Sequence, residues 1–356
     1  MQEIRVELTK NPKEKPADES KLSFGKLFTD HMFIMNYDEG EGWHDPRIVP
    51  YGTIELEPAS MCLHYGQAVF EGMKAYLAKD GRVLLFRPEK NMARLNQSND
   101  RLCIPPIDEV FAQKAIEKLV SIDKDWIPKA EGASLYIRPF IIGIDPYVGV
   151  HPAHHLLFMV ICSPVGAYYP EGLDPVKIYV ENQYVRSVRG GMGYVKAAGN
   201  YAASLKAQDE AEKQNYTQVL WLDGIERKYI EEVGTMNVFF VLDDEVVTPS
   251  LQGSILPGIT RMSTIEMLKE WGVKVTERRI SIEEIYEASQ NGRLKEAFGT
   301  GTAAVISPIG HLKWEDHIML INDGKIGPLS QKLYDTLTGI QWGNLEDTLH
   351  WTVEVQ

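Results

Sequence analysis

Short strand-like and helix-like segments alternate along most of the chain, and this alternation constrains the fold more than any other feature. Residues 83–86, 134–142 and 155–162 are rich in Ile, Val, Leu and Phe, as β-strands are. Pro88 opens a helix that we expect to reach about Leu102, because proline is favoured in the first helical turn. A chain that alternates in this way is expected to stack helices on sheets.

The same pattern continues through the second half of the chain. The predicted strands are 32–36, 83–86, 134–142, 155–162, 176–185, 217–222, 236–242, 273–280 and 295–299, and the predicted helices are 88–102, 108–122, 201–213, 259–270 and 282–290. Both halves therefore mix α and β structure. We expect an α/β (mixed α+β) protein with two domains.

A stretch rich in proline and glycine interrupts the alternation between Pro164 and Pro175. Such residues punctuate regular structure, so we interpret this stretch as the connection between two domains. The predicted organisation is an N-terminal arm, a smaller α/β domain, the connection and a larger α/β domain, at residues 1–24, 25–164, 165–175 and 176–356.

Composition excludes several classes of protein. A net charge of -13 argues against a nucleic-acid partner, which would need a basic face. The three cysteines, Cys62, Cys103 and Cys162, form no C-x-x-C pair and predict neither a disulfide framework nor a metal site. The longest apolar run, 156–162, is too short to span a bilayer, and the charged N-terminus is not a secretory signal. We expect a cytoplasmic protein without a membrane partner.

Lys196 is the first candidate for chemistry. It lies in the segment Gly193–Tyr201, between a predicted strand and a predicted helix, and its chain neighbours are apolar or small. Burial among such neighbours favours the neutral form of an amine, which Schiff-base chemistry with an aldehyde cofactor requires. An ordinary surface lysine is the alternative on local sequence alone.

Two loops have the composition of phosphate-binding loops. Residues 256–261 lead directly into a predicted helix, whose first N–H groups attract anions, and Thr260 adds a hydroxyl. Residues 299–302 follow a short strand and offer further N–H groups and hydroxyls, while Arg87 supplies a fixed positive charge. Ordinary turns and caps remain the alternative for each loop.

Two further side chains suit recognition of charged groups. Glu232 precedes the apolar strand 238–241, where it is either a solvated turn residue or the partner of a protonated ring nitrogen. Tyr136 and Arg138 share one face of a predicted strand, and an arginine there can hold a carboxylate bidentately. An exposed arginine on a strand is the alternative.

Two other motifs are weaker. Residues 299–304 match G-x-G-x-x-A, but no long helix follows, as a nicotinamide-dependent oxidoreductase would require. The histidines at 151, 154 and 155 surround Pro152 and show no acidic partner nearby, so we expect a loop or strand-end role and no metal.

Seven motifs in order resemble the branched-chain amino acid aminotransferases, which have the pyridoxal 5'-phosphate (PLP) fold type IV. They are Leu63-His64-Tyr65-Gly66 through Phe70-Glu71-Gly72-Met73-Lys74, then Phe86-Arg87-Pro88, Tyr136-Ile137-Arg138-Pro139, Lys196-Ala197-Ala198-Gly199-Asn200-Tyr201, Glu232 to Asn237, Leu256 to Arg261, and Gly299 to Ala303. The resemblance covers residues 25–343 and implies PLP as cofactor in the larger domain.

The resemblance also implies roles for individual residues. Lys196 would bind PLP covalently and move the proton during catalysis. The implied cofactor contacts are Glu232 to the pyridine nitrogen, Tyr201 to the phenolic oxygen, and Arg87, Ile259, Thr260 and Thr302 to the phosphate, with Arg186 near the cofactor. The implied substrate contacts are Thr235, Ala303 and Tyr65 to the α-carboxylate, Arg138 and Tyr136 to a distal carboxylate, and Phe70 and Tyr65 as apolar walls.

The implied reaction transfers the amino group of leucine, isoleucine or valine to 2-oxoglutarate in a homodimer. D-amino acid aminotransferase and aminodeoxychorismate lyase, which share the fold, are the nearest alternatives, and a non-catalytic ligand-binding protein is a third class. The mammalian family members carry a redox-active C-x-x-C, but Ala304 and Ser307 occupy those places here. The resemblance therefore implies no thiol regulation at this site.

Overall fold

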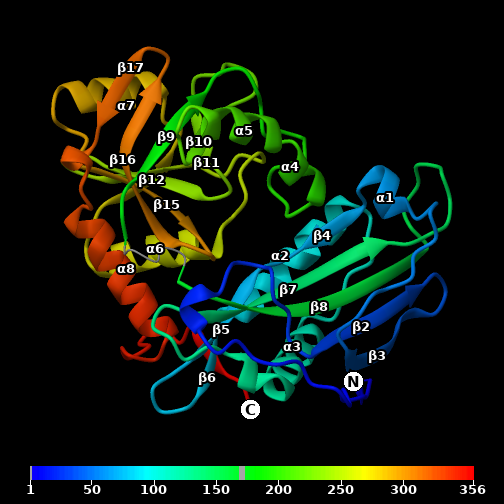
Figure 1. Cartoon of the computed structure of the whole chain (residues 1–356). Helices are drawn as coiled ribbons and strands as arrows, with labels where there is room; N and C mark the ends of the chain where they lie inside the picture. Colours follow the sequence, from blue (N-terminus) through cyan, green and yellow to red (C-terminus); the bar gives the residue numbers. More distant parts are fainter. Residues whose placement is uncertain (1, 168–172) are drawn as a thin grey trace. The chain divides into compact units, whose positions relative to one another are not determined.

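The computed structural model describes residues 2–167 and 173–356, and these divide into two compact units (Figure 1). The first comprises Met1–Pro170, Lys196–Ala198 and Gly339–Gln356, and the second comprises Glu171–Val195 and Gly199–Thr338. Part of the predicted connection, residues 168–172, lies outside the described residues. The predicted domain boundaries remain a proposal.

The first unit is built on one sheet, with strand order β1-β3-β2-β8-β7-β5-β6-β18 and with β4 paired to β7. Its strands are β1 (Arg5–Val6), β2 (His31–Asp38), β3 (Gly42–Pro50), β4 (Ala68–Phe70), β5 (Met73–Leu77), β6 (Val83–Phe86), β7 (Ser134–Gly143), β8 (His155–Val165) and β18 (Thr352–Glu354). Apart from the parallel pair β1–β3, neighbours run antiparallel, so short hairpins can connect them.

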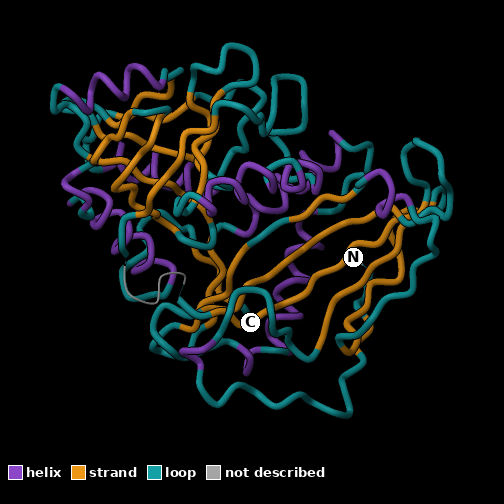
Figure 2. Tube along the Cα trace, turned by 45° about the horizontal axis from the view of Figure 1, so that its top comes forward, coloured by secondary structure: helices purple, strands orange, loops and turns teal. Residues whose placement is uncertain are grey.

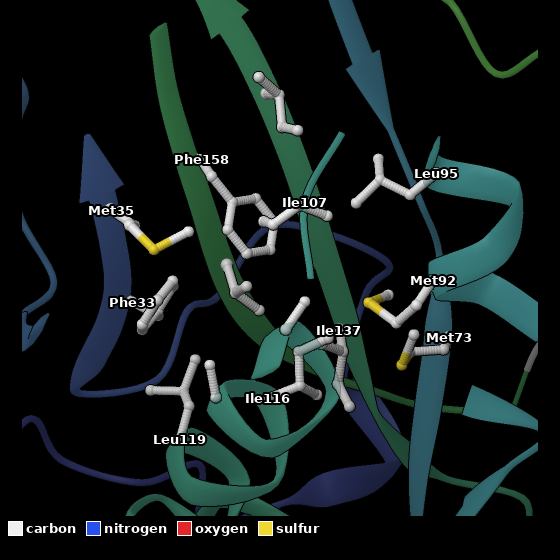
Figure 3. Close-up of a cluster of buried hydrophobic side chains, with 14 of the residues drawn as sticks. Phe33, Met35, Met73, Met92, Leu95, Ile107, Ile116, Leu119, Ile137 and Phe158 are labelled. Carbon is white, nitrogen blue, oxygen red and sulfur yellow. The ribbon is translucent and has the colours of Figure 1, made fainter. Parts of the chain in front are cut away.

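Helices α1 (Met61–Tyr65), α2 (Pro88–Arg101) and α3 (Glu109–Ile122) belong to this unit, with 3₁₀ turns at Glu19–Lys21 and Lys124–Trp126. Asp108 caps α3 by accepting the Phe111 N–H at 3.0 Å. The apolar residues of α3 recur on one stripe and are buried: Phe111, Ala112, Ala115, Ile116, Leu119 and Val120. Figure 3 shows Ile116 and Leu119 in the buried cluster with Phe33. Burying such side chains contributes roughly 1.5–3 kcal/mol each.

The second unit has its own sheet, with order β11-β10-β9-β16-β15-β12-β13-β14 and with β17 paired to β16. Its strands are β9 (Val176–Glu181), β10 (Gln218–Leu222), β11 (Ile230–Val233), β12 (Asn237–Val241), β13 (Val246–Pro249), β14 (Val275–Arg278), β15 (Glu296–Gly301), β16 (Val305–Trp314) and β17 (His317–Leu320). This sheet is mixed, because β9 runs parallel to β10 and β16 while β15 runs antiparallel to β12 and β16. Figure 2 distinguishes the strands of each unit from the helices beside them.

The helices of the second unit are α4 (Ala198–Ala202), α5 (Leu205–Lys213), α6 (Ile259–Glu270) and α7 (Ile282–Gln290), with a 3₁₀ turn at Asn322–Gly324. The boundary between the two units falls within the first residues of α4 and again within α8 (Pro328–Gln341). No described helix is long and apolar enough to cross a membrane.

Most predicted elements are confirmed, and three predictions need correction. The predicted helix 201–213 is two helices, because Ser204 bonds the Tyr201 carbonyl through its hydroxyl at 2.7 Å and competes with the helical bond. The predicted strand 176–185 ends at Glu181, whose carboxylate accepts the N–H groups of Gln183 and Tyr184 in a turn. The glycine-threonine segment is not a loop after a strand, since Gly299–Gly301 lie within β15.

Candidate active site

Lys196 lies between β9 and α4 and is fixed by its backbone on both sides. Its N–H donates to the Ser98 hydroxyl at 2.9 Å, and its carbonyl accepts the Phe70 N–H at 3.0 Å. Ala197 continues this contact through an isolated bridge to Val69. The side chain is half-buried, with Nζ 4.8 Å from the centroid of the Phe70 ring. The amine therefore lies above an apolar surface, on a backbone that cannot shift freely.

Glu71 brings a carboxylate near Lys196 that the local sequence around the lysine lacks. It is fully buried and pairs with Arg94 through two bonds of 2.8 Å, while Asn91 donates to it at 2.7 Å. Burial raises the pKa of Glu71, but Arg94 opposes this and, helped by Lys196 and Asn91, lowers the net pKa below its ordinary value. A buried, ionised carboxylate thus supports the region beneath the lysine.

Helix α2 supports this region, which was not predicted from the sequence. Asn91, Arg94 and Ser98 are three and four residues apart, so they lie on one face of the helix. All three are buried. Polar residues at helical spacing among the buried positions Met92 and Leu95 are the sequence signal that could have indicated this network.

One aromatic ring connects Lys196 with the predicted carboxylate-binding pair. The Arg138 guanidinium lies 4.5 Å from the Phe70 centroid and donates to the Tyr136 hydroxyl at 2.8 Å. Gly72 permits this arrangement, because a Cβ there would lie 2.2 Å from the Tyr136 hydroxyl oxygen. The first unit therefore brings Phe70, Tyr136, Arg138 and Lys196 together.

Tyr65 and Arg87 lie at two helix ends of the same unit. Tyr65 is the last residue of α1, is 40% exposed and has its ring beside that of His64. Arg87 precedes α2 in the left-handed conformation, with φ 49°, and is buried with its guanidinium 5.0 Å from the Trp351 ring. Such strain outside glycine persists only where surrounding contacts hold the residue, and it is common at binding sites.

Lys74 is a second buried amine in this unit. It lies directly opposite Tyr136 in the β5–β7 pair, so the two side chains share a face of the sheet. Burial lowers the pKa of Lys74 to about 8. No role was predicted for Lys74, although a lysine between Met73 and Ala75 in an apolar strand is a visible signal in the sequence.

Glu232 is a strand residue, and the alternative of a solvated turn is wrong. It lies in β11, is 4% exposed and forms an ion pair of 2.6 Å with Arg186. The Asn237 amide donates to its other carboxylate oxygen at 3.2 Å and to the Leu256 carbonyl at 2.9 Å. Arg186, expected only near the cofactor, is thus the charged partner of Glu232.

A small hollow in the second unit brings together three of the predicted residues. Tyr201, Glu232 and Thr235 line it with Arg186, Gly193, Val195, Asn200, Ser204, Gly234 and Leu256. The lining combines a buried ion pair with a phenol and a threonine that is exposed in the turn after β11. This combination offers charged and hydrogen-bonding groups to a small polar ligand.

The start of α6 has the features of an anion site. Its N-cap is Gly258, which has no side chain to bond the first N–H groups, and Ile259 and Thr260 begin the helix. A Cβ at Gly258 would lie 2.1 Å from the Asn237 amide oxygen, so the glycine allows Asn237 to reach this helix end. Asn237 therefore contacts both the N-terminus of α6 and Glu232.

Thr300 adds a buried hydroxyl to this region. It pairs with Asn237 across β12 and β15, so both side chains are on one face, and its Oγ1 has no hydrogen-bond partner among the described residues. Thr302 and Ala303 follow in the turn after β15 and are half-buried. A buried hydroxyl without a partner among the described residues and a helix start without a side-chain cap can both donate to a phosphate, so the donor set fits a phosphate-bearing cofactor.

Comparison with known proteins agrees with this geometry. Residues 68–312 match the family amino-transferase class IV. The chain is 60% identical to branched-chain-amino-acid aminotransferase 2 of Bacillus subtilis, over 99% of this chain and 97% of that protein. It is 56% identical to a probable branched-chain-amino-acid aminotransferase of Staphylococcus aureus, over 99% of both chains.

Solved structures show the same fold. The branched-chain amino acid aminotransferase of Escherichia coli superposes with a TM-score of 0.77 at 28% identity, covering 92% of this chain and 99% of that one. A T.th. branched-chain amino acid aminotransferase, solved with pyridoxamine 5'-phosphate, superposes with a TM-score of 0.74 at 27% identity, covering 90% and 98%. Family match, full-length identity and fold agree, and the chain belongs to the class IV aminotransferases of PLP fold type IV, within the branched-chain-amino-acid aminotransferase family.

Proposed function

We propose that this chain is a PLP-dependent aminotransferase that transfers the amino group of leucine, isoleucine or valine to 2-oxoglutarate. The observation that carries the proposal is the Phe70 ring, with the Lys196 amine 4.8 Å and the Arg138 guanidinium 4.5 Å from its centroid. An apolar wall suits a branched side chain, and a guanidinium suits the second carboxylate of 2-oxoglutarate. Both substrates of one exchange are thereby accommodated.

When bound, PLP supplies an electron sink for the negative charge that develops at the substrate Cα. The proposed role of Lys196 is to hold the cofactor covalently and to move the proton at that Cα. Glu232 would pair with the pyridine nitrogen and Tyr201 with the phenolic oxygen. Arg87, Ile259, Thr260 and Thr302 would hold the phosphate. Thr300 would join them, because its hydroxyl has no partner among the described residues.

The remaining assignments concern substrate and assembly. Thr235, Ala303 and Tyr65 would bind the α-carboxylate, and Arg138 with Tyr136 would bind the distal carboxylate. We also propose a cytoplasmic homodimer. Light scattering of the full chain should then give twice the 40.3 kDa chain mass, and a monomer would contradict this assembly.

The proposal is tested by measuring glutamate formed from 2-oxoglutarate and PLP with each branched-chain amino acid as donor. We expect activity with the three L-amino acids and none with D-alanine. Lys196→Ala should abolish it, whereas Lys206→Ala, which changes an exposed lysine of α5, should leave it unchanged. Absence of glutamate with all three donors would refute the function.

A further inference from the structure

The loop between β7 and β8 holds a buried aspartate against two histidines. Asp145 is 4% exposed, and its carboxylate accepts the backbone N–H of His154 at 3.0 and 3.1 Å and that of His155 at 2.6 Å. These bonds fix the orientation of the carboxylate. The expectation that the histidines have no acidic partner is therefore wrong, because the hairpin loop brings Asp145 to them.

The distances in this group suit a shared ion better than direct hydrogen bonds. His151 Nε2 lies 3.9 Å and His154 Nδ1 lies 3.8 Å from Asp145 Oδ2. Hydrogen bonds are shorter than this. Two ligand atoms that are each about 2.0–2.1 Å from one tetrahedral ion lie about 3.4 Å apart, so these distances have to shorten by about half an ångström on binding. All three ligand atoms lie within 4.8 Å of one another, and the half-exposed His154 side chain can close the remaining gap.

The tautomer of His151 also suits metal binding. Its Nδ1 lies 2.7 Å from the Pro152 carbonyl oxygen, which can only accept, so Nδ1 carries the proton. In the neutral ring, Nε2 then carries the lone pair and lies 3.9 Å from Asp145 Oδ2. Metal-binding histidines commonly donate their other ring N–H to a backbone carbonyl in this way.

A second aspartate–histidine cluster in the same unit, around Asp38, differs from the Asp145 group. Asp38 is bonded by His44 Nε2 at 2.6 Å and by His155 Nδ1, and these bonds, from His155 first, lower the pKa of Asp38. Here the imidazole nitrogens that would bind an ion are already hydrogen-bonded to the carboxylate. An ion there would have to displace two hydrogen bonds, so the Asp38 cluster serves as an internal control.

We propose that Asp145, His151 and His154 bind a divalent transition-metal ion with the preferences of Zn²⁺. Two imidazoles and one carboxylate are ligands that Zn²⁺ accepts, and water completes its coordination. The ion connects the start of the loop, just after β7, to its end at the start of β8. It therefore stabilises the loop, independently of the proposed transamination.

The test titrates the full chain, saturated with PLP and freed of metal by chelation, with ZnCl₂ in a calorimeter, and metal analysis after dialysis gives the stoichiometry. We expect one Zn²⁺ per chain. His151→Ala and His154→Ala should each weaken binding by at least about 10-fold, because each removes one of three protein ligands. Substituting the histidines leaves the Asp145 backbone bonds in place, so both variants should fold.

His44→Ala and His155→Ala are the matched controls, since both histidines belong to the Asp38 cluster. They should keep stoichiometric binding. Co²⁺ in place of Zn²⁺ should give visible absorption bands that disappear in His151→Ala. Absence of stoichiometric binding, binding that persists in both loop variants, or binding lost only in His44→Ala or His155→Ala would overturn the proposal.

Discussion

At Phe70, one aromatic ring lies beside two cationic groups with different proposed uses. We propose that the Lys196 amine takes part in the chemistry and that the Arg138 guanidinium recognises a carboxylate. Each lies within the distance at which a cation interacts favourably with a ring face. Neither group has to enter an unfavourable environment when an apolar substrate replaces a charged one, because the ring remains its neighbour.

Arg138→Ala should lower the rate with the dicarboxylate substrates much more than the rate with leucine. Losing a charge-assisted bidentate contact should cost roughly 1.5–3 kcal/mol for glutamate and 2-oxoglutarate, about one to two powers of ten in kcat/KM. The leucine half-reaction should change much less, because leucine has no distal carboxylate. Single-turnover rates of the two half-reactions measure this difference, and equal losses would remove Arg138 from substrate selection.

Glu71→Gln should destabilise the protein at neutral pH. It keeps the shape of the side chain but leaves Arg94 buried without its counter-charge, which typically costs about 3–5 kcal/mol. Urea unfolding at pH 7 measures the loss, and Glu55→Gln, at an exposed carboxylate, is the control. A loss under about 1 kcal/mol would show that the pair contributes little.

The same residue predicts the pH dependence of stability. The folded-state pKa of Glu71 is lowered, so its stabilisation is present above the unfolded pKa of about 4.3 and is lost as pH falls through the folded value. The wild-type protein should therefore lose more stability than Glu71→Gln between pH 5 and acid pH. An equal loss of stability in the two proteins over this pH range would contradict the prediction.

At the scale of the element, α6 begins beside Asn237, which also bonds Glu232 and Leu256. Gly258→Ala would place a Cβ against the Asn237 amide, which must then move away from Glu232 and Leu256. We expect PLP affinity to fall by about 10-fold or more, since losing one hydrogen bond to a charged group costs about 1.5–3 kcal/mol. Fluorescence titration of PLP measures this. Gly52→Ala, where a Cβ meets only Pro50 O at 4.0 Å, should bind PLP normally, and an unchanged affinity in Gly258→Ala would contradict the account.

Local sequence sufficed for elements whose ends carry their own signals. Helices 259–270 and 282–290 were predicted at their observed bounds, and each directly follows a residue favoured at a helix start, Gly258 or Ser281. It failed where a side chain competes with the backbone, as Ser204 does between α4 and α5. β16 was missed for another reason: its Pro308 is atypical of a strand that is paired on both sides.

At the scale of the whole molecule, the candidate residues come from segments far apart in the chain. The ordered motifs predicted the family and fold, and the family comparison and the superposed structures confirm both. The motifs could not predict the contacts of Glu71 with Arg94, of Glu232 with Arg186, or of Asp145 with its histidines, because each depends on tertiary pairing. The roles of the individual site residues stay predictions.

Reductive trapping tests the central claim, that Lys196 performs transamination of branched-chain amino acids, most directly. The full chain with PLP is reduced with borohydride and digested, and the labelled peptide is identified by mass spectrometry. We predict the phosphopyridoxyl label on Lys196, its loss after prior incubation with leucine, isoleucine or valine, and its return when 2-oxoglutarate is then added. A label on another lysine, or a label at Lys196 that none of the three amino acids removes, would contradict the account.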